Sequence, residues 1–430
     1  MSWQYNTLWI KNKTKKRLLV ENKKLAFFNA TVIVAALGYF VDIYDLLLFG
    51  IIRIPSLKEL GLTADQITTD GEAVLSFQMF GLMIGGILWG VLGDKKGRLS
   101  VLFGSILLYS LANIANGFVQ DVEQYKWIRL LAGIGLAGEL GAGITLVSEI
   151  MPKEKRGLAT SFVAGFGILG AVVAFFIKEE FHWRTCYFIG GGLGIILLIL
   201  RISVVESGVY NKIKEHSHIQ KGNLMMLFSN KKRLVKYIKC IMIGMPTWLV
   251  VGIMISFSSE FAKHFGIQEP VDPGKAIMYA YIGLALGDIL IGVISQWLKS
   301  RLKALFIFYG LSVLLLMIFF TTLWNSNAVS MYWVCGALGF ASGYWAIFVT
   351  IGAEHFGTNL RATAATTIPN FVRGLLAIFI IPLFKFFRSF DAIGYVNGAI
   401  ITSVIVFAIT IYAAMTLDET FHVDMDYQEE

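Results

Sequence analysis

Residues 303–324 read KALFIFYGLSVLLLMIFFTTLW, and no charged residue follows the opening lysine. An α-helix needs about 20 mainly apolar residues to cross the hydrocarbon core of a bilayer, so this run predicts a membrane-spanning helix. Similar runs recur along the chain, separated by short charged segments. The predicted helices are residues 26–52, 73–93, 99–118, 125–150, 157–178, 184–205, 236–260, 275–297, 303–324, 330–354, 362–387 and 393–417.

The composition is that of a protein with many membrane crossings. Hydrophobic residues make up 56% of the 430 residues, charged residues only 15%, and the mean hydropathy is +0.67. A membrane β-barrel is excluded, because the runs are too long for its strands and do not alternate apolar with polar residues. We therefore expect an all-α membrane protein with twelve transmembrane helices embedded in a lipid bilayer.

The placement of basic residues predicts the orientation of the helices. Of the 37 lysines and arginines, 25 fall on one side of the predicted helices, 9 on the other and 3 inside them. Lysine and arginine accumulate in cytoplasmic loops, so both termini are predicted to be cytoplasmic. We expect a multi-pass protein of the plasma membrane, or of the inner membrane if the source is bacterial. The net charge of +8 thus reflects topology and does not indicate nucleic-acid binding.

One long hydrophilic stretch, residues 206–235, separates six predicted helices from the other six. We interpret it as a linker between two helix bundles. The predicted parts are a basic cytoplasmic leader at 1–25, an N-terminal bundle at 26–205, the cytoplasmic linker at 206–235, a C-terminal bundle at 236–417 and an acidic cytoplasmic tail at 418–430.

The two predicted bundles share sequence features. An offset of 205 residues places Glu149 and Arg156 over Glu354 and Arg361. Two similar bundles are typical of transporters that work by alternating access, in which the halves rock around a site near the membrane midplane. A second offset, of 202 residues, aligns Gly81, Gly85 and Gly90 with Gly283, Gly287 and Gly292.

The turn after the second predicted helix reads GVLGDKKGR at residues 90–98. It resembles the loop signature of the major facilitator superfamily, and the segment from Glu354 to Arg361 resembles the family's pattern after the tenth helix. Asp42-Ile-Tyr-Asp45 in the first helix is similar to metabolite, organic-acid and phosphate proton symporters. The resemblance implies two pseudo-symmetric six-helix bundles and secondary transport of a small molecule.

The resemblance also implies a cytoplasmic gate built from charged residues at helix ends. Opposite charges there can pair across neighbouring helices. The corresponding turn in the second half has Gln296 where the first half has an acid, so any lock there is expected to be weaker or differently made. The expected gate residues are Asp94, Arg98, Glu149, Arg156, Glu354 and Arg361.

Asp42, Asp45 and Arg129 are expected to form a proton-coupling cluster. At about 1.5 Å rise per residue they lie at similar depth. Two carboxylates three residues apart share a helix face and oppose joint ionisation, which favours binding and release of a proton. Arg129 would then exchange partners as the proton arrives. The alternatives are a static ion pair that joins two helices, or carboxylates wetted at the outer interface.

A second group lies deeper, near the midplane: Glu139, Asp288 and Arg373. We expect Arg373, with Asn370 one turn before it, to bind the substrate, because a guanidinium fork suits a carboxylate or phosphate. Asp288 would neutralise Arg373 in the empty carrier or take up the proton, and we assign Glu139 to the proton-coupling set. The alternative is a permanent salt bridge from Arg373 to Asp288 or Glu139.

Aromatic residues and prolines mark the second half. Tyr344 and Trp345 in the tenth helix and Trp248 in the seventh are expected to line the substrate cavity, although such residues more often serve packing. Three prolines fall inside predicted helices of the second half, whereas the predicted helices of the first half contain none in mid-helix. The second half is therefore expected to bend more. The prolines are Pro246, Pro369 and Pro382.

These features together predict a proton-coupled symporter of a small anionic metabolite that functions as a monomer. We expect no cofactor, no metal and no nucleic-acid partner, since the sequence contains no metal-ligand spacing. An enzyme is not expected, because no nucleophile motif or phosphate-binding loop is present. The alternatives are a neutral-solute, sugar-type porter in which Arg373 is structural, and a membrane receptor that has lost transport.

Overall fold

The computed structural model describes residues 30–96, 98–139, 141, 143, 147, 153–204 and 225–422, and within these parts every regular element is helical. The first bundle contains α2 (Ala30–Glu59), α3 (Ala64–Lys96), α4 (Arg98–Asn116), α5 (Val122–Leu136), α7 (Lys153–Glu180) and α8 (Trp183–Val204). The second contains α10 (Met225–Ser229), α11 (Lys231–Met242), α12 (Met245–Leu249), η2 (Val250–Ile255), α13 (Ser258–His264), α14 (Pro273–Leu298), α15 (Arg301–Thr322), α16 (Ala328–Ala341), α17 (Trp345–Glu354), α18 (Thr358–Leu375), η3 (Leu376–Ile380), α19 (Ile381–Arg388) and α20 (Gly394–Met415).

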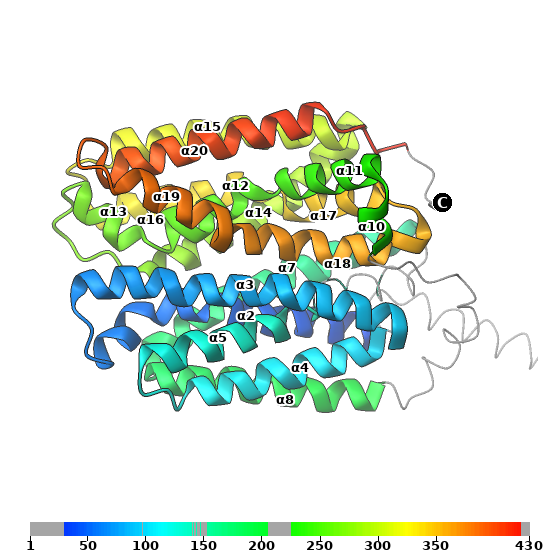
Figure 1. Cartoon of the computed structure of the whole chain (residues 1–430), viewed down its shortest axis with the longest axis horizontal. Coiled ribbons are helices and arrows are strands. Elements are labelled where there is room, and N and C mark those ends of the chain that lie inside the picture. The colour runs from blue at the N-terminus through cyan, green and yellow to red at the C-terminus, as the bar shows by residue number, and fades with distance from the viewer. Residues whose placement is uncertain are drawn as a thin grey trace, which may run out of the picture.

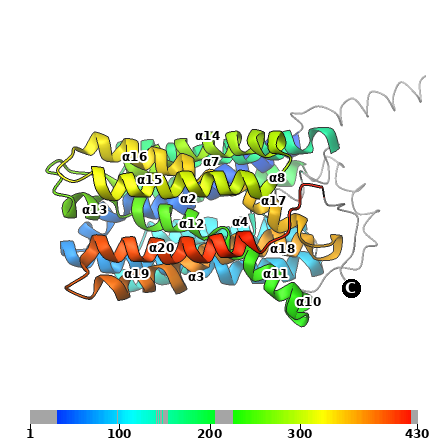
Figure 2. The ribbon, with the colours of Figure 1, turned by 90° about the horizontal axis from the view of Figure 1, so that it is seen from above.

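These helices form two bundles that lie side by side with their long axes roughly parallel (Figure 1). In the described parts, ten helical segments are long and apolar enough to cross a membrane, α4 contains a shorter apolar helix, and α5 lies where the fourth helix was predicted. Contact between the bundles comes mainly from α3 along α18 and from α7 along α14 (Figure 2). The expected all-α membrane fold is confirmed.

The two ends of the molecule face opposite sides of the predicted membrane. The linker face is the end at which α8 ends and α11 begins, and it also carries Glu354 (Figure 1). The opposite face is the end at which α2 ends and α13 lies. On the predicted topology, the linker face is cytoplasmic.

Glycines explain why the two bundles share a sequence pattern. Four glycines, two in α3 and two in α14, face backbone carbonyls of α5 and α16, and a Cβ at any of these four would overlap a carbonyl oxygen. The helices of each pair can therefore approach closely only without side chains at these positions. The contacts are Gly81 with Leu130, Gly85 with Ile134, Gly283 with Gly336 and Gly287 with Phe340.

Both bundles interrupt the same helix. The fourth crossing turns at Ala137 and Gly138 after α5, and the tenth crossing is broken between α16 and α17. Gly138 and Gly343 differ by 205 residues, the offset that also aligns Glu149 with Glu354. The repeat thus extends to the position of the helix break.

The second bundle contains further irregular helices. The π-helical η2 follows α12, which has Pro246 in its first turn, and η3 follows α18, which contains Pro369. These segments lie where bending was expected. The expectation for the first bundle was wrong in one respect, because α2 continues through Pro55 to Glu59.

One predicted helix boundary also shifts. Helix α11 begins at Lys231, inside the predicted linker, because the Asn230 side chain caps it by accepting the Lys232 N–H at 2.9 Å. Of the predicted leader, linker and tail, only residues 225–235 and 418–422 fall within the described residues.

Candidate substrate and proton site

Arg373 lies in α18 and is only 1% exposed. Its guanidinium carbon lies 5.8 Å from the ring centre of Trp248 and 5.6 Å from that of Trp345. Its Nη1 donates to Asn370 Oδ1 at 3.4 Å. Among the described residues, no carboxylate lies within ion-pair distance of Arg373, so the alternative of a permanent bridge to Asp288 or Glu139 is not realised in this structure.

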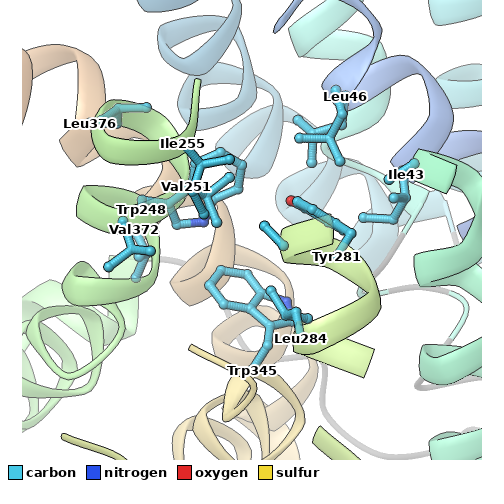
Figure 3. Packing of buried hydrophobic residues seen from close by; sticks show 14 of the residues in the cluster. Ile43, Leu46, Trp248, Val251, Ile255, Tyr281, Leu284, Trp345, Val372 and Leu376 are labelled. Carbon is cyan, nitrogen blue, oxygen red and sulfur yellow. The ribbon is translucent and has the colours of Figure 1, made fainter. Parts of the chain in front are cut away.

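The surroundings of Arg373 contain further donors without acceptors. The indole nitrogens of Trp248 and Trp345 and the Nε of Arg373 are buried and have no hydrogen-bond partner in the described part of the chain. Buried polar groups are usually paired, so such a group of donors marks a place where water or a ligand supplies acceptors. Figure 3 shows the two indoles converging, with Tyr281 of α14 and Leu46 of α2 nearby.

Asp288 lies in α14 and contacts the neighbouring helix rather than Arg373. Its Oδ1 accepts the N–H of Ala346 at 3.1 Å, one residue into α17. The carboxylate therefore caps the helix whose first residue is Trp345, a position where negative charge is favourable. Tyr344, before that helix, packs its ring edge-on against Tyr309 at 5.4 Å.

Arg129 and Asp45 form a completely buried ion pair in the first bundle. Nη1 of Arg129 lies 2.9 Å from Asp45 Oδ1, and Nη2 donates to the Asp45 main-chain carbonyl at 3.0 Å. Asn113 also accepts from Nη1, at 3.4 Å. Both charged side chains are 0% exposed. The structure thus brings together two of the three residues expected in the proton-coupling cluster.

Asp42 is the third member, and it is separate from Arg129. It is fully buried, and neither carboxylate oxygen has a hydrogen-bond partner among the described residues. Arg373, in the opposite bundle, lies close enough for its positive charge to act on Asp42. Of the expected cluster, Arg129 thus contacts only Asp45, through both the side chain and the main chain of that residue, and Asp42 is not bonded to it.

Glu139 was expected at the depth of Asp288 and Arg373, but it pairs with neither of them. Its carboxylate pairs with Arg201 of α8, with Nη1 at 3.0 Å from Oε2 and a second contact from Nη2 to Oε1. Glu139 is 1% and Arg201 5% exposed. Gly38 of α2 leaves space for this pair, because a Cβ there would collide with both side chains.

The sequence model of the Major Facilitator Superfamily matches residues 27–382. The chain belongs to the Major Facilitator Superfamily. It is therefore a membrane transporter that crosses the bilayer many times and carries a small molecule.

Relatives and a solved structure agree with this family. The niacin transporter NiaP of Acinetobacter baylyi is 26% identical over 80% of this chain and 84% of its own length. The 3-(3-hydroxy-phenyl)propionate transporter of Escherichia coli is 26% identical over 68% of this chain and 72% of its own. The crystal structure of a D-xylose-proton symporter superimposes with a TM-score of 0.63 over 90% of this chain and 96% of that one, at 16% identity, and shows the same fold.

The expected gate of this superfamily member is only partly visible at the linker face. The side chains of Asp94, Arg98 and Arg156, and all of Glu149, lie outside the described residues. Glu354 pairs with Arg301 at 3.3 Å. Arg361 is partly buried near the start of α18.

The tail reinforces the contact between Glu354 and Arg301. Thr420 donates to Glu354 at 2.6 Å, and Glu419 accepts the N–H groups of Arg301 at 2.9 Å and Leu302 at 3.2 Å. Burial alone would raise the pKa of the Glu419 carboxyl, but the hydrogen bonds from Ser300 and these N–H groups hold it below its usual value. The second half thus has a differently made contact in place of the missing acid.

The opposite face carries ion pairs between the two bundles that the sequence did not reveal. Arg53 of α2, 1% exposed, contacts both carboxylate oxygens of Glu260 in α13, at 2.7 and 3.0 Å. Burial would raise the pKa of Glu260, yet the Arg53 charge holds it below its usual value. The other pairs are Lys178 with Asp272 at 2.7 Å, Lys385 with Glu72 at 3.1 Å and Arg388 with Glu72 at 2.8 Å.

Proposed function

We propose that this transporter imports a small aromatic carboxylate together with a proton. The observation that carries the proposal is Arg373, buried between two indoles and without a carboxylate partner among the described residues. A guanidinium binds a carboxylate through two parallel hydrogen bonds, and indole faces suit a planar apolar body. Two relatives named above are named for niacin and for 3-(3-hydroxy-phenyl)propionate, both aromatic acids.

Asp42 is proposed as the group that carries the proton. A buried carboxylate without a partner is least costly when neutral, unless a positive charge approaches it. In the empty carrier, the negative charge of ionised Asp42 compensates the positive charge of Arg373. Once Asp42 is protonated, the charge of Arg373 is available to the substrate anion. Proton and anion are then bound together, and the net charge near Arg373 stays constant.

The buried pair of Arg129 and Asp45 is proposed to support this exchange from the first bundle. Asp45 lies one turn from Asp42 on α2, and its charge acts on Asp42. Because Arg129 neutralises Asp45, a proton arriving at Asp42 meets one uncompensated carboxylate rather than two. Glu139, paired with Arg201, is proposed to act in the same way from the other side.

Alternating access would use the two faces in turn. The proposed orientation, with both termini in the cytoplasm of a plasma or inner membrane, makes the linker face the inner one. The pairs around Glu260 and Glu72 would close the outer side, and the contacts around Asp94, Arg98 and Glu354 the inner side. A single chain holds both parts of the site, so we propose that the monomer transports.

Uptake into proteoliposomes tests the proposal. We expect radiolabelled nicotinate or 3-(3-hydroxyphenyl)propionate to accumulate when the outside is acidic, beyond the diffusion seen in protein-free liposomes, and xylose not to accumulate. Accumulation of aromatic acids that ignores the pH gradient would contradict proton coupling. Xylose uptake that persists in Arg373→Ala would favour the neutral-solute porter instead.

A further inference from the structure

Asn370 connects the substrate arginine to the opposite bundle. The side chain belongs to α18 and is 2% exposed. Its Oδ1 accepts from Arg373 at 3.4 Å, while its Nδ2 donates to the Ala137 carbonyl at 2.8 Å and to the Thr366 carbonyl at 2.9 Å. A carboxamide has one acceptor oxygen and two N–H donors, so the orientation is fixed by its partners. Asn370 thus has little free capacity for a substrate.

The contact with Ala137 lies where the fourth crossing of the first bundle is interrupted. Ala137 is the C-cap of α5, the helix that carries Arg129, and it begins the helix break before Glu139. Its carbonyl lies at that break and accepts from the other bundle. Gly86 of α3 makes room for this approach, because a Cβ there would lie 2.9 Å from the Asn370 Cβ.

We propose that Asn370 is a positioning residue that links occupation of Arg373 to the first bundle, and that it does not itself touch the substrate. The inference rests on the proposed function. A substrate carboxylate bound at Arg373 competes with Asn370 Oδ1 for the hydrogen bond that Arg373 Nη1 donates. Rocking that separates α18 from α5 must break the bond to Ala137. Anion binding and bundle movement therefore act on the same amide, which also holds Arg373 in the position from which its charge acts on Asp42.

Such a link has a thermodynamic signature. If proton and anion sites are coupled, each changes the affinity of the other by the same factor. The proton site invoked is Asp42, and its surroundings come from both bundles. The charged and titratable groups that act on it or on which it acts are Asp45 and Tyr39 of α2, Tyr109 of α4, Glu139, Tyr281 of α14 and Arg373 of α18.

Calorimetric titration of the purified full chain with 3-(3-hydroxyphenyl)propionate, in buffers of different ionisation enthalpy, tests the link. The wild type is expected to take up close to one proton per bound anion at pH 8 and little at pH 6, and to bind about ten-fold more tightly at pH 6 than at pH 8. In Asn370→Ala, the affinity at pH 6 is expected to stay within about three-fold of the wild type, while the pH dependence falls to about two-fold. Exchange of labelled for unlabelled substrate should continue, whereas proton-driven accumulation should fail.

Two further variants serve as an independent test and as a control. Gly86→Ala pushes Asn370 away without altering it and should reproduce the loss of linkage. Thr402→Val removes a buried hydroxyl of α20 that bonds only its own helix, to Gly398 at 2.7 Å, and should behave as the wild type. All variants are compared after gel filtration, so that only folded protein is titrated.

The possible outcomes separate the two proposals. Failure of the wild type to bind an aromatic acid or to take up a proton would overturn the proposed function. If the wild type binds an aromatic acid and takes up a proton, the result for Asn370→Ala decides the inference. Weak binding with normal proton uptake in that variant would make Asn370 a substrate contact and overturn the inference. Unchanged affinity and unchanged linkage would overturn it too.

Discussion

The two bundles treat the buried arginines around the candidate site differently. In the first bundle, Arg129 pairs with Asp45 and Arg201 pairs with Glu139, and all four side chains are buried. In the second, Arg373 is equally buried but has no carboxylate partner among the described residues. A paired charge fixes the helices that supply it, whereas an unpaired one is stable only if something else approaches it. The first bundle is thus arranged as a scaffold and the second as a receptor for an anion.

The helices follow the same division. The second bundle places π-helical turns at η2 and η3 and a break before α17, all beside the residues that surround Arg373. Within residues 30–204, as far as they are described, the corresponding irregularity is the turn after α5. A helix with local irregularity can bend at small cost. We therefore expect the second bundle to deform around the substrate while the first moves more nearly as a unit.

Removing Arg129 should have the largest effect on stability. Arg129→Ala leaves Asp45 buried without its partner, and loss of one member of such a pair costs about 3 to 5 kcal/mol. Thermal unfolding in detergent, with Arg373→Ala measured in parallel, checks this. Equal melting temperatures for the two variants would contradict the difference between the bundles.

Removing Arg373 should have the largest effect on binding. Arg373→Ala loses the charge-assisted contact with the carboxylate and should weaken aromatic-acid binding by about a hundred-fold. Arg373→Lys keeps the charge but not the fork, and should lose about ten-fold. Calorimetry on folded protein measures both, and the thermal stability of both should stay close to that of the wild type.

Asp42→Asn should convert pH-dependent binding into pH-independent binding. The amide mimics the protonated acid, so affinity at pH 8 should rise about ten-fold toward the value at pH 6. Substrate exchange should persist, and accumulation driven by a pH gradient should stop. Binding that keeps its pH dependence in this variant would assign the proton to another carboxylate.

The pair of Arg53 and Glu260 should give the smallest of these effects. Because the folded-state pKa of Glu260 is lowered, its contribution is present above the usual pKa of a glutamate and is lost as the pH falls through the lower folded value. Glu260→Gln should therefore weaken closure of the opposite face by about 1 to 2 kcal/mol near neutral pH. Labelling of the Gly274→Cys variant by a polar thiol reagent reports that opening. The Glu123→Gln variant, which affects an exposed pair within the first bundle, is the control.

Sequence reasoning predicted the crossings and the repeat because hydropathy and glycine spacing are properties of single helices. It also identified which helices carry buried charges. It did not predict which charges meet, since rise along a helix gives depth but not facing. Glu139 and Asp288 were expected at the depth of Arg373, yet one faces Arg201 and the other the N–H of Ala346. Arg53 was missed because α2 continues beyond the predicted end at residue 52.

An experimental structure with bound 3-(3-hydroxyphenyl)propionate tests the central claim most directly. The account predicts both carboxylate oxygens about 2.7 to 2.9 Å from the guanidinium nitrogens of Arg373, with the ring between Trp248 and Trp345. A ligand whose carboxylate lies elsewhere, with Arg373 bonded to Asp288 or Glu139, would contradict it.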